Sequence, residues 1–73
     1  MNIVSIIQQE LDRRGWTQKE LALRAGIAAA TINHIMTGRI VSPTVFTLWR
    51  IAKALGLTLN DLTEESGAYG VRR

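Results

Sequence analysis

The chain has 73 residues, which is enough for one domain and too few for a second. Hydrophobic residues make up 47% of it, which excludes a disordered chain, and the lack of cysteine excludes disulfides and thiolate metal sites and fits a reducing compartment. The net charge is +3, and Glu20 is the single acid between Arg13 and Asn60, so the basic middle of the chain suits a polyanionic partner.

The two ends of the chain show no targeting or membrane segment. The amino-terminal residues lack the basic leader of a signal peptide, and no apolar run approaches the ~20 residues that a membrane span needs. We therefore expect a soluble, cytoplasmic protein with no membrane partner. Residues 66–73 contain glycine and lack periodicity, so we expect a domain at residues 1–65 followed by a flexible tail at residues 66–73.

The first predicted helix runs from about residue 3 to Gly15. Its apolar residues recur at intervals of four and form one stripe, and the basic pair before the glycine suits a helix carboxyl terminus. This stripe consists of Ile3, Ile7 and Leu11. Trp16 follows, and we expect its side chain to close the edge of the core between this helix and the next.

A capping box opens the second predicted helix. The Thr17 hydroxyl can accept a hydrogen bond from the Glu20 amide, while the Glu20 carboxylate can reach back to the Thr17 amide. Gly26 ends this helix, at a position where a left-handed backbone conformation is wanted. A third helix is predicted from about Ala28 to Met36.

Two further helices are predicted near the end of the chain. Ser42 and Pro43 open the fourth helix, with a hydroxyl at the cap and proline at the first helical position, and Gly56 ends it. A short fifth helix starts at residues 58–61. The apolar residues of these two helices are Val45, Leu48, Ile51, Ala52, Leu55, Leu59 and Leu62. No segment has the period of a strand, so the sequence predicts an all-α fold of five short helices.

The second and third predicted helices are the informative pair. A turn at Gly26 joins them. We expect the two helices to cross at Ala22, because a small side chain there lets them approach closely. If Ile32 and Ile35 face the core, the outer side of the third helix is free to enter a DNA major groove. The residues on or near that outer side are Ala29, Ala30, Asn33 and His34.

The sequence motifs resemble those of a known family. They are TQ-x-ELA-x(3)-GI, then TI-x(2)-I-x-TGR, a proline, and LWRIAKALGLTLNDL. Together they are similar to the lambda-repressor-like, Cro-type (XRE) family, over about residues 3–63. The resemblance implies a compact five-helix fold in which helices 2 and 3 form a helix-turn-helix. It also implies that the chain binds double-stranded DNA as a transcriptional regulator.

The resemblance assigns roles to individual positions. The positions of Thr17 and Gln18 contact a backbone phosphate in this family, and the loop that holds Thr37 and Arg39 contacts another. The positions on the outer side of the third helix face base edges. The DNA-binding residues implied are Thr17, Gln18, Ala28, Ala29, Ala30, Asn33, His34, Thr37 and Arg39.

Two features depart from the family pattern. Ala28 stands where the family often has a Ser or Thr that caps the third helix and touches phosphate, and such a replacement costs roughly 0.5–2 kcal/mol of stability. Ala29 and Ala30 offer bases only methyl contacts, for example with thymine. We therefore expect sequence discrimination to depend on His34, Asn33, methyl contacts and DNA shape.

The remaining chemistry of the sequence is sparse. His34 is the only histidine, and no cysteine or cluster of carboxylates accompanies it, so we expect no metal site, no cofactor and no enzymatic activity. Phe46 and Trp49 are three residues apart and offset from the core stripe, so they form a protein interface or lie partly under a loop or the tail. Leu59 and Leu62 on the fifth predicted helix are an alternative protein interface to Phe46 and Trp49.

The sequence therefore predicts a sequence-specific regulator that acts as a homodimer, with repression the expected outcome. Three alternatives stay open. The chain could be an antitoxin that holds a toxin partner protein, or a restriction-modification controller of the same fold. It could also be a protein-interaction module that has lost DNA binding, which the alanines at positions 28–30 would favour.

Overall fold

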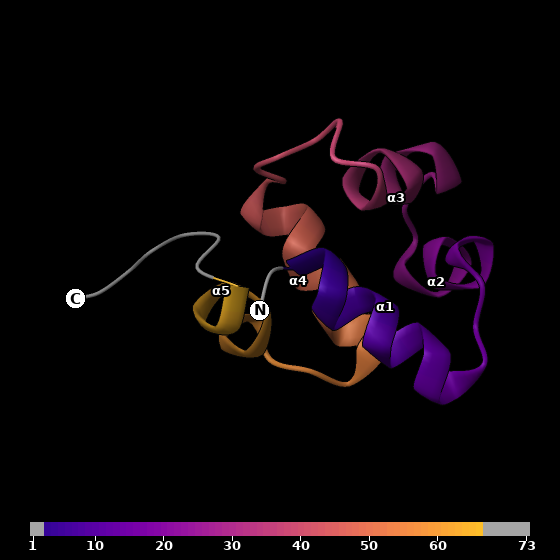
Figure 1. Cartoon of the computed structure of the whole chain (residues 1–73), viewed down its shortest axis with the longest axis horizontal. Helices are drawn as coiled ribbons and strands as arrows, with labels where there is room; N and C mark the ends of the chain where they lie inside the picture. Colours follow the sequence, from indigo (N-terminus) through magenta and orange to yellow (C-terminus); the bar gives the residue numbers. More distant parts are fainter. Residues whose placement is uncertain (1–2, 67–73) are drawn as a thin grey trace.

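Five α-helices follow one another in the computed structural model, which describes residues 3–66 and the side chains of residues 3–62. They are α1 (Ile3–Arg14), α2 (Gln18–Ala25), α3 (Ala29–Met36), α4 (Val45–Leu55) and α5 (Leu59–Ser66) (Figure 1). The described residues contain no strand, and the predicted all-α, five-helix fold is confirmed. Of the predicted tail, Ser66 ends α5 and residues 67–73 lie outside the described residues. The domain boundary after residue 65 stays a prediction.

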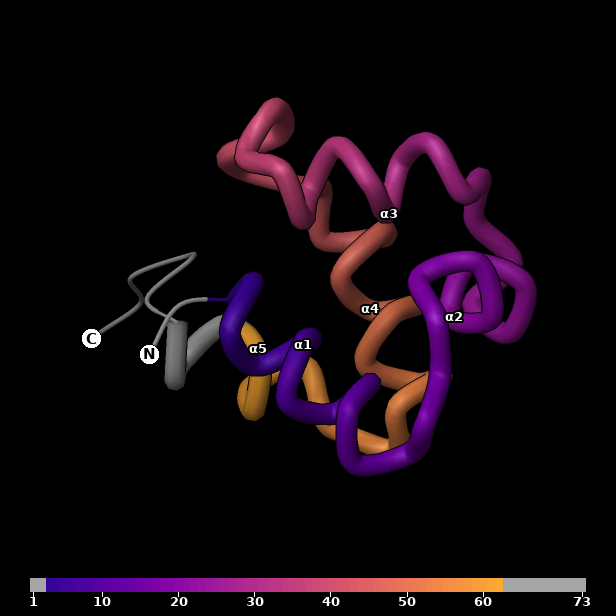
Figure 2. The backbone as a smooth tube through the Cα atoms, turned by 45° about the vertical axis from the view of Figure 1, so that its right-hand side comes forward, coloured from indigo at the N-terminus to yellow at the C-terminus, as the bar shows by residue number. Residues whose placement is uncertain are grey.

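One hydrophobic core holds the five helices together. α2 packs against α3 and α4, while α5 packs against α4 and α1. The backbone view shows α3 at the top, with α1, α4 and α5 all below it (Figure 2). The fully buried large side chains come from all five helices and are Ile7, Leu11, Leu21, Ile32, Ile35, Leu48, Ile51, Leu55 and Leu62. No helix in the described part of the chain combines the length and apolarity that crossing a bilayer requires.

The amino-terminal cap of α2 forms as predicted in one half only. Thr17 Oγ1 accepts from the Glu20 amide at 3.1 Å, which confirms the cap. The Glu20 carboxylate does not complete the box: it turns along the helix and accepts from Nε of Arg24 at 2.6 Å. An opposite charge one turn away competes successfully with a neutral backbone amide for this carboxylate.

Trp16 closes the edge of the core as predicted. Its ring is partly buried against the core cluster. The guanidinium groups of Arg14 and Arg24 lie 5.5 and 4.4 Å from the ring centroid, so two cations cover its outer side. Arg14 also donates to Glu10 and to the Leu55 carbonyl oxygen, and this ties the end of α1 to the end of α4.

The start of α4 differs from the prediction. Thr44, and not Ser42, is the cap, and its hydroxyl accepts from the Thr47 amide at 3.1 Å. Pro43, predicted as the first helical residue, is buried in the loop before the helix begins. The buried stripe of α4 starts only at Leu48, and Val45, which the apolar pattern groups with it, is 52% exposed at the first turn.

The end of the fold corrects the predicted interface at Leu59 and Leu62. The Thr58 amide donates to Asp61 Oδ2 at 2.8 Å and the Asp61 amide donates to Thr58 Oγ1 at 3.1 Å, which is a complete capping box for α5. This start directs Leu62 into the core, where its exposed fraction is 0%, and leaves Leu59 half-buried against the same core. A buried leucine offers no surface to a second chain, so Leu62 is not an interface residue.

Candidate nucleic-acid interface

The turn between α2 and α3 is built from short backbone contacts. Gly26 has φ +70°, the left-handed conformation that ends α2, and the Ile27 amide donates to the Ala22 carbonyl oxygen at 3.0 Å. Ala22 is buried at the contact, as its predicted place at the crossing requires. Arg50 of α4 adds a bond from outside the motif, since its Nη1 donates to the Ala25 carbonyl oxygen at 3.2 Å. The turn is therefore held by both backbone and side-chain contacts.

The core anchors α3 through one side and leaves its other side free. Ile32 and Ile35 are each 1% exposed and fix the helix against the core. Successive helical residues are about 100° apart, so Ala30 lies opposite this anchor, with Asn33 and His34 on its two sides. Ala29 and Ala30 are exposed at the start of the helix and His34 is half-buried near its end. The outward face predicted for the third helix thus exists.

Gln18 and Asn33 bring α2 and α3 together at this face. Asn33 Nδ2 donates to Gln18 Oε1 at 3.4 Å, across fifteen positions of the sequence. The bond engages the oxygen of the Gln18 amide and leaves its nitrogen available as a donor for an anion. It also places Asn33 beside the amino-terminal end of α2, away from the His34 side of the helix.

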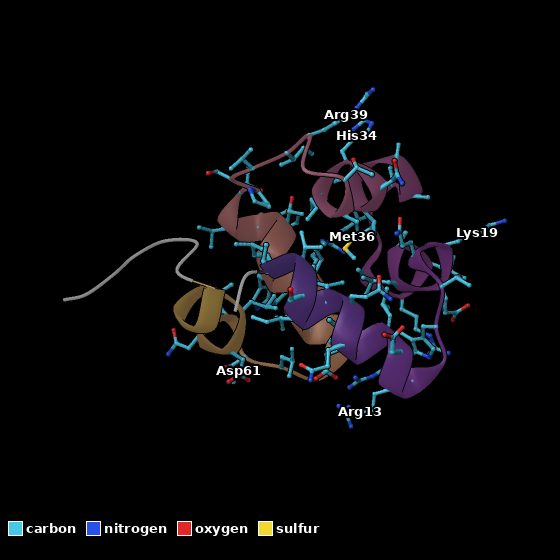
Figure 3. The ribbon with its side chains drawn as sticks, in the orientation of Figure 1. Arg13, Lys19, His34, Met36, Arg39 and Asp61 are labelled. Atoms are coloured by element: carbon cyan, nitrogen blue, oxygen red, sulfur yellow. The ribbon has the colours of Figure 1, made fainter. Side chains whose placement is uncertain are left out.

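The loop after α3 folds back onto the end of that helix. Thr37 Oγ1 donates to the Asn33 carbonyl oxygen at 2.9 Å, and the Ile40 amide donates to the His34 carbonyl oxygen at 3.0 Å. Arg39 stands between these two anchors and is exposed. Its side chain and that of His34 lie at the same upper edge of the molecule and extend away from α1 and α5 (Figure 3). Arg39 and His34 therefore share one edge of the face.

From Thr17 to Arg39 the motif carries one acidic residue, Glu20, and Asp12 of α1 lines a hollow together with Gln18 and Thr37. No Asp or Glu occurs between Glu20 and Asp61 in the sequence, and Glu20 pairs with Arg24. Lys19 extends from α2 into solvent on the right-hand side of the view (Figure 3). Arg39 and Lys19 are two exposed cations of the motif, and its one carboxylate is paired with Arg24.

The structure brings most of the predicted DNA-binding residues to this face. Thr17 is exposed as the cap of α2, and Ala28 is exposed as the cap of α3, where its side chain makes no capping hydrogen bond. The predicted interface residues Phe46 and Trp49 lie apart, on α4, and both are exposed. Among the described residues, no group of three or more His, Cys, Asp or Glu side chains could hold a metal ion.

One contributor to this site has no sequence signal. Arg50 stands in the second half of the chain within an ordinary amphipathic helix, so its pattern indicates only a solvated side chain. Its bond to the Ala25 carbonyl oxygen spans twenty-five positions of the sequence. Such a contact follows from how α4 packs on α2, which the periodicity of neither helix specifies.

Two short helices around a left-handed glycine, with the second anchored by one side and free on the other, define a helix-turn-helix domain of the DNA-binding class. Residues 7–62 match the profile of the family described as Helix-turn-helix. The chain belongs to this family, in its XRE branch, and is a DNA-binding regulator of that type. Searches of curated proteins and of solved structures gave no match.

Proposed function

We propose that the chain is a transcriptional repressor that binds a specific double-stranded DNA sequence as a homodimer, with α3 in the major groove. The outward face of α3 carries this proposal. Ala29 and Ala30 are exposed and small, so the helix can approach the base edges closely and offer its methyl groups to thymine. Asn33 and His34 stand on either side of Ala30 as the polar groups of the same face.

Phosphate contacts fix the register of the helix in this proposal. Gln18 lies at the amino-terminal end of α2 with a free amide donor, and Arg39 lies in the loop after α3. These two groups come from the two ends of the motif in sequence and can each hold a backbone phosphate. Thr17 adds a hydroxyl donor, since its oxygen accepts from the Glu20 amide and its proton stays available, and exposed Thr37 lies in the loop with Arg39. The proposal needs no cofactor and no catalytic step, and it places the protein in the cytoplasm with DNA.

The homodimer is part of this proposal, and the geometry of DNA sets the spacing of its half-sites. Two copies related by a two-fold axis would cover half-sites about 34–36 Å apart, one helical turn of the duplex. Sedimentation of the protein with a palindromic duplex tests this part. A complex of two chains per duplex is expected, and a complex of one chain per duplex at saturation would contradict the homodimer.

Selection of bound sequences from a random duplex pool tests the DNA specificity. The selected duplex should bind more tightly than random DNA, and Ala30→Glu should weaken it by about tenfold or more, because a carboxylate then faces the phosphates. Asn60→Asp is the matched control, since it adds the same charge on α5 at an exposed position. Equal effects of the two substitutions, or no enrichment of any sequence, would contradict the proposal.

A further inference from the structure

The outer side of α4 combines exposed aromatic rings with cations. Phe46 is 61% exposed and Trp49 is 46% exposed, and their ring centroids are 6.4 Å apart. Because helical residues are about 100° apart, Arg50 and Lys53 project from the same sector of the helix as these rings. We call these four residues the basic aromatic face. A contiguous pair of exposed rings on so small a domain points to a binding surface.

Each ring of this face is covered on one side by its own cation. The Arg50 guanidinium lies 4.8 Å from the Phe46 centroid, and Lys53 Nζ lies 5.0 Å from the Trp49 centroid. Trp49, Arg50 and Lys53 also line a hollow of about 390 Å³ between the carboxyl end of α2 and α4. The hollow gives an incoming side chain a place to insert beside the Trp49 ring.

The two cations of the face form no ion pair with the side chains of residues 3–62, since no carboxylate there lies at ion-pair distance from Arg50 or Lys53. Arg24, which also lines the hollow, is paired with Glu20 on its own helix. The face therefore offers two unopposed positive charges directly beside exposed apolar surface.

We propose that the basic aromatic face binds an acidic segment of another protein. An apolar or aromatic side chain of that segment packs on Phe46 and Trp49, and its carboxylates pair with Arg50 and Lys53. Aromatic anchors rimmed by complementary charges are the usual composition of a protein-binding surface. This inference is independent of the DNA interface, which occupies α3 and the opposite, amino-terminal end of α2.

The charges of the face disfavour two other occupants. A second copy related by a two-fold axis would present the same face to itself, and Arg50 and Lys53 would approach cations of the same sign. Duplex DNA would engage the two cations of this face through its phosphates alone. The exposed rings would find no partner on paired bases.

Titration calorimetry with synthetic peptides tests the proposal on the full chain. The probe is a twelve-residue peptide that alternates glutamate with leucine and phenylalanine, and its counterpart carries lysine in place of glutamate. The acidic peptide should bind one-to-one and weaken as salt is added, whereas the lysine peptide should not bind. Trp49→Ala and Lys53→Glu should each weaken binding of the acidic peptide about tenfold.

Lys19→Glu is the matched control, because it makes the same charge change at an exposed lysine on α2 and should leave peptide binding unchanged. Lys53 is substituted in preference to Arg50, since Arg50 also holds the turn of the helix-turn-helix. Circular dichroism should show unchanged helicity for all variants. Absence of saturable binding, or equal losses for Lys19→Glu and Lys53→Glu, would overturn the proposal.

Two further outcomes would assign the face to another occupant and also overturn the proposal. If Trp49→Ala converts a dimer to a monomer in sedimentation, the face joins two copies of this chain. If Lys53→Glu weakens DNA binding as strongly as Arg39→Ala does, the face belongs to the nucleic-acid interface.

Discussion

Arg50 occupies the space that a β-carbon on Gly26 would need. That carbon would lie 2.7 Å from Nη1 of Arg50, and the same Nη1 donates to the Ala25 carbonyl oxygen at 3.2 Å. Gly26 also has φ +70°, which L side chains rarely adopt. The backbone conformation therefore favours glycine at this position, and a β-carbon there would also displace the end of the flexible Arg50 side chain from the turn.

Gly26→Ala should destabilise the fold more than Gly56→Ala does. Both glycines have φ +70° and share the cost of a left-handed alanine, about 1–2 kcal/mol. At Gly56 the nearest atom to the new carbon, Arg14 Nη2, would be 3.7 Å away, which is ordinary contact. Urea unfolding followed by circular dichroism measures the difference. Combining Gly26→Ala with Arg50→Ala should cost less than the sum of the two, and strict additivity would argue against the shared space.

Asn33→Ala should weaken DNA binding about two- to tenfold on every sequence, because it removes the bond that holds the Gln18 amide in place. Fluorescence anisotropy of the single variants Asn33→Ala and Gln18→Ala and of the double variant measures the coupling. The double variant should be no weaker than Gln18→Ala alone. Independent, additive losses would mean that Asn33 makes its own DNA contact.

Arg39→Ala should weaken binding to cognate and random duplexes alike and reduce the slope of log K against log salt by about one. We expect this because Arg39 is an exposed cation on a short loop that is anchored to the end of α3 and carries no base-reading group. Arg13→Ala on α1 is the control, since it removes an exposed cation on another helix and should leave the slope unchanged. A changed base preference with an unchanged slope would assign Arg39 to base reading.

His34→Ala should cost roughly 1–2 kcal/mol at one base position of the selected duplex and little on random DNA. The imidazole is the longest polar side chain on the outward face of α3, and it can donate to a purine N7 in the major groove. Binding to a panel of duplexes with single substitutions identifies the position. Equal losses on the cognate and the random duplex would show that His34 reads no base.

The carboxylate of Glu10 should make stability depend on pH in the acid range. The hydrogen bond from Arg13 at 2.6 Å lowers the pKa of Glu10 below its ordinary value of 4.5; burial opposes this, and Arg14 adds to it. Because the folded-state pKa is lowered, this stabilisation is full above pH 4.5 and is lost as the pH falls through the folded value. The stability advantage of the wild type over Glu10→Gln should therefore be largest above pH 4.5 and shrink as the pH falls below it in urea unfolding. An advantage that stays constant would contradict it.

Local patterns account for the helices and for most of their ends. The four-residue spacing of Ile3, Ile7 and Leu11 predicts α1, and the Thr17 hydroxyl and Gly26 mark the two ends of α2. These signals act within one or two turns of helix, so they can be read from a short window of sequence. The start of α4 is the exception, since the sequence predicts a cap at Ser42 and the structure has it at Thr44, two residues later.

Long-range contacts are the part that sequence patterns do not specify. Arg14 donates to the Leu55 carbonyl oxygen and Arg50 donates to the Ala25 carbonyl oxygen. The sequence pattern around each of these arginines indicates only a solvated side chain. The sequence is equally compatible with Leu62 in the core and with Leu62 in an interface, and only the packing of α5 distinguishes the two. At the candidate site, the outward face of α3 follows from the anchors Ile32 and Ile35, whereas the pairing of Asn33 with Gln18 depends on the angle between α2 and α3.

The burial of Leu62 sets an order of events during synthesis. Leu62 is 0% exposed, and α5 packs against both α4 and α1, which leaves the ribosome before the other four helices. Until α5 has emerged, the core that anchors α3 is open on one side, and truncating a buried leucine of this kind costs about 2–5 kcal/mol. A growing chain therefore carries the complete recognition motif before it can hold that motif rigid. Nascent chains and fragments cut before Leu62 should be sensitive to proteases, and competent regulator should accumulate only from chains that have passed this point.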